Sequence, residues 1–223
     1  MTDPVELGAM DLAALLCSRV CHDIISPVGA IVNGLEMLDE QKDEETRAFA
    51  FDLIRKSANQ ASAKLQFARL AFGAAGSAGA EIDLGDAEKV ATGYMKGEKP
   101  SFSFTAPRAY MAKDRVKLLL NLILLAQAAI PAGGSIAVVV DGDVAAPRFA
   151  LRSTGPRPRV PAAFEKLVPG EADPASIDAH AVQGYYTGAL ARAARMTVSA
   201  RLDGDAVVIE AAAQDAPTSI AAA

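Results

Sequence analysis

The sequence predicts a helical hairpin that forms a dimeric four-helix bundle, followed by an α/β sandwich domain. From about residue 5 to residue 72, apolar residues recur at spacings of three and four, as in packed helices. Residues 73–80 are only Gly, Ala or Ser, a composition typical of a linker. Beyond them the apolar pattern alternates between helix and strand periods. We therefore place two domains, at residues 1–76 and 81–214.

The first domain contains two apolar helical stripes. The expected seam of the first helix comprises Met10, Ala14, Cys17, Cys21, Ile24, Val28, Ile31, Leu35 and Leu38. The expected seam of the second helix comprises Ile54, Ala58, Ala61, Leu65, Ala68 and Phe72. Between them, the charged residues 39–44 suit an exposed turn, so the helices form an antiparallel hairpin. Two helices cannot bury so wide an apolar face alone, which predicts a homodimer.

The second domain shows three helices and five strands in its periodicity. We expect helices at residues 84–95, 113–130 and 176–195, and strands at 101–105, 135–141, 148–152, 196–202 and 206–212. Asp203-Gly204 is a typical hairpin turn between the last two strands. The expected architecture has the helices on one face of a mixed sheet, and residues 215–223 are expected to be disordered.

Composition narrows the environment of the protein. The net charge of the 223 residues is −5 and no long basic run is present, which argues against nucleic-acid binding. Acidic residues stand near the N-terminus where a secretory signal carries positive charge. The most apolar stretch, residues 116–130, contains polar residues and is too short to cross a bilayer. With only two cysteines, the chain is expected to be a soluble, cytoplasmic protein without a membrane partner.

His22 is the strongest candidate for a chemically active residue. Advancing about 100° per residue places it roughly 130° from the buried direction of the first helix, accessible to a partner. A neutral imidazole is a nucleophile near pH 7. Asp23, on the outer half of the helix, could hold its tautomer or accept a proton. Pro27, which lacks an N–H, is expected to bend the helix one turn later.

Two other interpretations of His22 are open from the residues alone. A single surface histidine is most often only solvated. A metal site with Cys17 and Cys21 is disfavoured, because both cysteines are expected to point inward and His22 outward. The other histidine, His180, belongs to the second domain and has no ligand spacing around it.

The outer face of the first helix is a candidate surface for docking a partner protein. Its residues are Arg19, Ser26, Gly29, Ala30 and Asn33. If the hairpin turns near residue 41, Lys64 and Arg69 border the same surface. These two cations could equally well only solvate the bundle.

Residues 22–31, His-Asp-Ile-Ile-Ser-Pro-Val-Gly-Ala-Ile, resemble the H-box of sensor histidine kinases. Together with Phe-Ala-Arg-Leu-Ala-Phe-Gly at 67–73, the whole chain resembles the ChpT family of histidine phosphotransferases. The resemblance implies that His22, assisted by Asp23, passes phosphoryl groups between receiver aspartates in a bacterial cell-cycle phosphorelay. It also implies the partners: the receiver of a hybrid histidine kinase, and response regulators of CtrA and CpdR type. The receiver is expected to bring its own Mg²⁺.

The second domain resembles a histidine-kinase ATPase domain whose nucleotide-binding boxes are altered. Leu125 stands where the N-box has its second asparagine, although Asn121 is retained. Ser153 replaces the adenine-binding aspartate, and Arg157 replaces a glycine two residues after Gly155. Without these oxygen ligands and glycines, Mg²⁺ and the phosphates lose their protein partners.

Two further segments match the same domain only loosely. Residues 164–167 resemble the F-box, and residues 183–188 stand near the glycine-rich phosphate loop, where two tyrosines would crowd a triphosphate. We therefore expect no ATP, no other cofactor and no metal bound by this chain. The alternatives are an ATP-dependent kinase with an atypical nucleotide site, and a non-catalytic adaptor that binds receivers.

Overall fold

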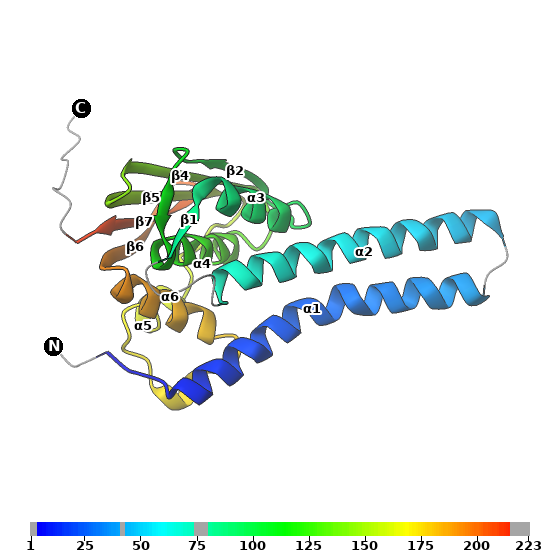
Figure 1. Cartoon of the computed structure of the whole chain (residues 1–223), viewed down its shortest axis with the longest axis horizontal. Helices are drawn as coiled ribbons and strands as arrows, with labels where there is room; N and C mark the ends of the chain where they lie inside the picture. Colours follow the sequence, from blue (N-terminus) through cyan, green and yellow to red (C-terminus); the bar gives the residue numbers. More distant parts are fainter. Residues whose placement is uncertain (1–3, 41–42, 74–79, 215–223) are drawn as a thin grey trace.

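The computed structural model describes residues 4–40, 43–73 and 80–214, and shows a long helical hairpin that projects from an α/β domain (Figure 1). The helices are α1 (Ala9–Glu40), α2 (Glu44–Ala71), α3 (Leu84–Met95), α4 (Lys113–Ala129), α5 (Ala163–Lys166), the 3₁₀ turn η1 (Pro174–Ser176) and α6 (Val182–Ala193). The strands are β1 (Glu81–Asp83), β2 (Ser101–Thr105), β3 (Tyr110–Ala112), β4 (Ser135–Asp143), β5 (Ala146–Thr154), β6 (Met196–Asp203) and β7 (Ala206–Ala213).

The expected hairpin is confirmed, and its second helix starts with a side-chain cap. The Thr46 N–H donates to the carboxylate of Asp43 over 2.8 Å, and this bond holds the pKa of Asp43 below its usual range. Residues 41–42 of the expected turn lie outside the described residues, as do 74–79 of the linker and 215–223 of the tail. The domain boundaries at 1–76 and 81–214 therefore stay predictions.

α1 runs through Pro27 without interruption and changes direction along its length (Figure 1). Pro27 is buried, and a proline inside a helix removes one backbone hydrogen bond and favours a bend. About two turns later, Gly34 lies close to α2. A Cβ atom there would come within 2.6 Å of Ile54 Cγ1 and 3.3 Å of the Ala50 carbonyl oxygen. The helices can approach this closely only because Gly34 has no side chain.

α2 covers only part of the predicted seam, because it packs to one side of it. α2 faces the side of α1 that carries Pro27 and Gly34. Several predicted seam residues are exposed in the chain, namely Met10, Ala14, Cys17, Cys21, Val28 and Leu35 on α1, and Ala58 and Leu65 on α2. The two cysteines are thus left exposed by α2, and their predicted inward orientation depends on the second hairpin of a bundle. The apolar stripe is wider than one neighbouring helix can cover, and periodicity alone cannot decide which half that neighbour takes.

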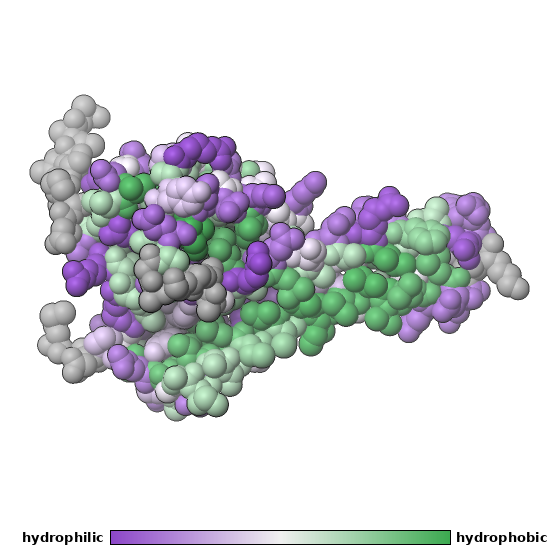
Figure 2. Space-filling model, viewed as in Figure 1, coloured by the Kyte–Doolittle hydropathy of each residue, from purple (hydrophilic) through white to green (hydrophobic). Residues whose placement is uncertain are grey.

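The uncovered half of the stripe forms a hydrophobic face along the hairpin (Figure 2). On α1 its large residues are Met10, Ile25, Val28, Val32 and Leu35, each at least 44% exposed. Such a contiguous apolar face marks an interaction surface in a soluble protein. Of the described helices, α1 also has the length and apolar composition that would allow a membrane crossing.

The second domain is a mixed five-stranded sheet with strand order β2-β4-β5-β7-β6. β2 pairs with β4 in parallel, and the other pairs are antiparallel. β6 and β7 form the predicted hairpin, with Gly204 at a φ of +60° in its turn. The helices α3, α4 and α6 pack on one face of the sheet, as expected.

Most predicted elements of this domain are confirmed, with two kinds of error. The short strands β1 and β3, which pair with each other, and the one-turn helix α5 were not predicted. The last helix begins at Val182 rather than at residue 176, since 174–176 form only a 3₁₀ turn. The apolar stretch 116–130 is explained by α4, which is buried along most of its length in the centre of the domain.

The close approach at Gly34 generates a prediction about stability. Gly34→Ala should lower the melting temperature, because its new methyl group would press against Ile54 and overpacking typically costs about 1–3 kcal/mol. Gly29→Ala is the matched control on the same helix, since a Cβ atom there meets nothing within 4 Å. It should raise the melting temperature, because helix propensity alone increases the free energy of unfolding by up to about 1 kcal/mol. Equal shifts in both variants would contradict the packing described for the hairpin.

Candidate functional site

His22 lies on α1 with 69% of its side chain exposed, as its helical position predicted. Its Nδ1 is 3.6 Å from Oδ1 of Asp23. The other carboxylate oxygen of Asp23 accepts a hydrogen bond of 3.1 Å from Nε of Arg19, one turn earlier. The carboxylate is thus held between a guanidinium and the imidazole. It can stabilise positive charge on the ring from the Nδ1 side and leave Nε2 available for reaction.

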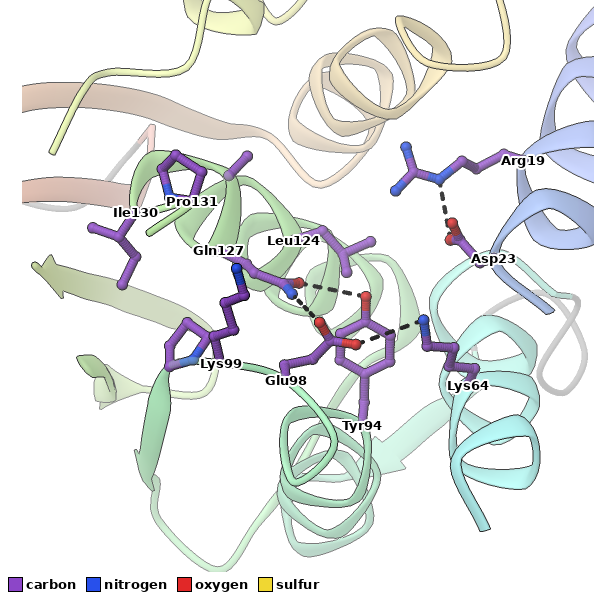
Figure 3. A pocket seen from close by; sticks show the side chains of 12 residues that line it. Arg19, Asp23, Lys64, Tyr94, Glu98, Lys99, Leu124, Gln127, Ile130 and Pro131 are labelled. Carbon is purple, nitrogen blue, oxygen red and sulfur yellow. Dashed lines mark hydrogen bonds and ion pairs between the residues drawn. The ribbon is translucent and has the colours of Figure 1, made fainter. Parts of the chain in front are cut away.

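Asp23 does not lie on the outer half of the helix, contrary to expectation. Only 27% of its side chain is exposed, and it turns toward the second domain, where it lines a cavity of about 420 Å³ (Figure 3). The cavity lies between the hairpin and the α3–α4 side of the second domain. Its charged lining consists of Arg19, Asp23, Lys64, Glu98 and Lys99. The error arose because the expectation considered the hairpin alone, whereas the second domain covers this side of α1.

A chain of polar contacts crosses this cavity and joins the two domains (Figure 3). Lys64 Nζ of α2 is 3.6 Å from a carboxylate oxygen of Glu98, whose other oxygen accepts a 2.7 Å bond from Gln127. The hydroxyl of Tyr94 donates to the Gln127 amide oxygen at 3.4 Å. Burial, reinforced by the nearby charge of Glu98, raises the pKa of Tyr94 far above its usual value, so its hydroxyl keeps its proton.

The predicted docking residues do not form one surface in the structure. Ser26, Gly29 and Asn33 are exposed on the face of α1 that carries His22. Ala30 is partly covered. Arg19 and Lys64 face the cavity, and Arg69 is exposed at the end of α2, in a groove that β1 and α3 also line. The surface beside His22 is therefore narrower than expected, and Lys64 makes an interdomain contact.

The structure also brings His180 to the site, which sequence reasoning missed. Its ring centroid is 5.4 Å from that of His22, and the two ring planes are nearly perpendicular at 89°. The two histidines are far apart in sequence, and no local pattern around His180 indicates the contact. The described residues contain no group of three or more His, Cys, Asp or Glu side chains able to hold a metal ion.

The contact between the histidines depends on how α1 packs against the second domain. The N–H of Val5 donates to the Gly170 carbonyl at 2.9 Å, and the N–H of Leu7 donates to the Tyr185 hydroxyl at 2.8 Å. A small apolar cluster continues this contact; it joins Leu12, Leu15 and Leu16 of α1 to Ile177, Val182 and Tyr185. The first turns of α1 are thereby fixed to the loop that precedes α6.

Two residues at the positions of the nucleotide-binding boxes, Asn121 and Ser153, make hydrogen bonds within the protein. Asn121 is fully buried and its amide donates to the carbonyls of Ala71 and Lys117, at 3.1 and 2.8 Å. Its oxygen accepts a 2.8 Å bond from Gln183. Ser153 is fully buried and donates to the Ala126 carbonyl at 2.9 Å. Because Ala71 ends α2, Asn121 ties the hairpin to the second domain.

The segment expected near a phosphate loop is part of α6. At Gly184 a Cβ atom would lie 2.6 Å from that of Ala163, and at Gly188 it would clash with the Val168 carbonyl oxygen. These glycines allow α6 to pack closely against α5 and the residues after it. They do not form an open loop with free N–H groups.

Comparisons with known proteins agree with this architecture. Residues 84–206 match the family model of the histidine phosphotransferase C-terminal domain. The protein phosphotransferase ChpT of Brucella abortus is 53% identical over 211 residues, covering 95% of this chain and 100% of that protein. A solved structure of a bacterial phosphotransferase is 51% identical and covers 93% of this chain and 98% of its own, with a TM-score of 0.85. The histidine kinase AdeS of Acinetobacter baumannii aligns more weakly, at 10% identity over 86% of this chain and 96% of that chain, with a TM-score of 0.44.

The exposed histidine on a helical hairpin, joined to this C-terminal domain, defines a histidine phosphotransferase. The chain belongs to the ChpT family of these enzymes. Family membership confirms the class that the H-box motif indicated, and the fold expected from it.

The anchoring role of Asn121 leads to a second prediction. Asn121→Ala should lower the free energy of unfolding by about 1–3 kcal/mol, because it leaves the buried Ala71 carbonyl and the Gln183 amide without partners. Asn33→Ala, at an exposed position on α1, should leave stability within about 0.5 kcal/mol. Chemical denaturation of both variants measures the difference. An unchanged midpoint for Asn121→Ala would contradict its role as an interdomain anchor.

Proposed function

We propose that this protein relays phosphoryl groups between receiver aspartates of a two-component phosphorelay through His22. The observation that carries the proposal is the exposed imidazole of His22 with the Asp23 carboxylate beside Nδ1 and Arg19 holding that carboxylate. A phosphotransferase needs an accessible nucleophile whose charge is compensated as the bond forms. This arrangement meets both requirements.

The transfer step needs little from the protein beyond position and charge. The Nε2 lone pair of His22 attacks the phosphorus of an aspartyl phosphate, and the P–O bond breaks with its electron pair staying on the aspartate. The imidazole becomes positively charged, and Asp23 stabilises this charge at Nδ1. The reverse sequence delivers the group to a second receiver. Mg²⁺, expected on the receiver, would neutralise charge on the phosphoryl oxygens.

ATP is not expected to take part. The support for this comes from the residues that correspond to the nucleotide boxes. Asn121 and Ser153 are fully buried and form their hydrogen bonds within the chain, so they are not available to a nucleotide. Leu125 cannot ligate magnesium. The glycines near residue 184 are packed inside a helix. A phosphoryl group must therefore come from another protein.

The uncovered apolar face of α1 supports a homodimer. Val28, Val32 and Leu35 would be buried if a second hairpin packed against this face to complete a four-helix bundle. His22 and Asp23 interrupt α1 with polar groups near its middle, which suits a bundle with a functional outer face better than a span in lipid. A soluble dimer in the cytoplasm fits both features.

The resemblance to ChpT also suggests the partners. We expect the receiver of a hybrid histidine kinase upstream, and response regulators of CtrA and CpdR type downstream. Ser26, Gly29 and Asn33 form the exposed surface next to His22 on which a receiver would dock. Gly29 lets a partner approach α1 closely because it adds no side chain.

The phosphotransfer proposal is tested with a radiolabelled, phosphorylated receiver domain and no ATP. The unmodified protein should acquire acid-labile label, and His22→Ala should acquire none while it keeps its melting temperature, because His22 is exposed. A receiver pull-down on both proteins serves as the binding control. Binding without label on the unmodified protein would favour a non-catalytic adaptor. Label that appears from ATP alone would favour a kinase.

The dimer proposal predicts the effect of a charge on the apolar face. Leu35→Asp should give a monomer in light scattering, because dimerisation would bury an unpaired carboxylate. The chain itself should stay folded, since Leu35 is already 50% exposed. Asn33→Asp adds the same charge to the same turn outside the apolar stripe and should stay dimeric. A dimer in both variants would place the interface elsewhere.

A further inference from the structure

We infer that His180 is a second imidazole of the phosphotransfer site, which donates a hydrogen bond to the phosphoryl group when His22 carries it. The inference rests on the proposed function of His22 and extends it to a residue of the second domain. It assigns that domain a direct part in the chemistry.

The position of the two rings is the first argument. Their centroids are 5.4 Å apart with perpendicular planes, so His180 stands next to the acceptor but does not cover it, and His22 stays 69% exposed. A phosphoryl group adds three oxygen acceptors to His22. An imidazole has an N–H donor in both its neutral and its charged form. Oxygens bound to His22 on this side come within reach of that donor.

The backbone on either side of His180 is firmly held. The Asp178 carboxylate accepts two hydrogen bonds through one oxygen, from the N–H of His180 at 2.9 Å and of Ala181 at 2.8 Å. These bonds lower the pKa of Asp178, so the carboxylate stays charged and caps the turn that precedes α6. The apolar cluster around Ile177 and Val182 presses the same loop against α1. His180 is thus presented to His22 by two independent anchors.

The His180 side chain itself is uncommitted. Within the described residues its imidazole makes no hydrogen bond, and its only ring contact is with His22. A hydrogen-bonding group held beside a nucleophile without a partner of its own is available for what the nucleophile receives. The Asp178 carboxylate attracts the His180 ring electrostatically, but it uses its hydrogen bonds on the backbone and makes none with the imidazole.

The charges around His22 favour the same side. Asp23 lies at Nδ1, and a phosphoryl group with a charge of about −1.5 to −2 is repelled from it. Arg19 is engaged by Asp23 and turned into the cavity. Ser26, one turn along α1, carries a hydroxyl donor on the face of His22, and His180 is the donor that the second domain brings to the His22 ring. A donor aimed at developing phosphoryl charge stabilises the transition state as well as the product.

The test measures transfer from a radiolabelled, phosphorylated receiver domain to the full-length protein and its variants. His180→Ala should slow the appearance of label on His22 by about tenfold, the effect of losing one hydrogen bond to a charged group. His180→Gln keeps an N–H donor and should recover part of the rate. Glu171→Ala, an exposed change in the same segment, should transfer at the unmodified rate.

A spectroscopic measurement separates direct contact from loss of structure. On phosphorylation of His22, the ring nitrogen NMR signals of His180 should shift in the unmodified protein. Melting temperatures of the His180 variants should match that of the unmodified protein, because only backbone atoms of His180 are used in the cap.

The possible outcomes distinguish this inference from the proposed function. If the unmodified protein and His22→Ala both take no label, the proposed function fails and this inference fails with it. If only His22→Ala loses label while His180→Ala transfers at the full rate, this inference alone is overturned. Label on His22→Ala that disappears when His180 is also replaced would make His180 an acceptor and would likewise overturn its role as a donor.

Discussion

The attachment of the hairpin to the second domain determines the geometry of the rest of the molecule. It is made at two places: the first turns of α1 pack on the loop before α6, and the end of α2 is held by Asn121. Between them, the Lys64–Glu98 pair crosses a partly open cavity. Apolar burial and buried hydrogen bonds are the strong contributors here, whereas the largely covered Lys64–Glu98 ion pair adds little, because desolvation offsets its attraction. Because these contacts fix the second domain against α1, the surroundings of His22 include residues from both domains.

The same contacts show how the second domain uses the residues that stand at the positions of the nucleotide-binding boxes. Asn121 anchors α2, Ser153 bonds to the backbone of α4, and Gly184 allows close helix packing. In each case a residue type suited to binding a nucleotide satisfies a packing or hydrogen-bonding need of the protein. A buried amide cannot serve both purposes, since its donors and acceptor are already engaged. The second domain therefore acts as a rigid support that places the loop containing His180.

The width of the apolar stripe on α1 is the other organising constraint. One side of the stripe packs against α2, where Gly34 allows the closest approach, and the other side remains as an exposed hydrophobic face. A hairpin with two apolar sides needs a second partner surface, for which we propose a second hairpin of the same kind. The polar residues of the candidate site occupy the third side. Around the circumference of α1, the intrachain packing, the exposed apolar face and the candidate site are thus separate.

The sequence by itself determined the local structure and the identity of the acceptor candidate. Periodicity located both long helices and the main strands, and the His-Asp pair with Pro27 indicated the site, because these features depend on residues close together in the chain. It missed the short strands β1 and β3, which exist only through their mutual pairing. It also assigned Asp23 to the wrong side of α1, and it did not show that α2 leaves Cys17 and Cys21 exposed, since an amphipathic pattern does not say which part of a wide stripe each neighbour covers. Only the tertiary structure decided that Lys64 faces Glu98 and that His180 faces His22, because contacts between distant segments depend on how whole domains pack.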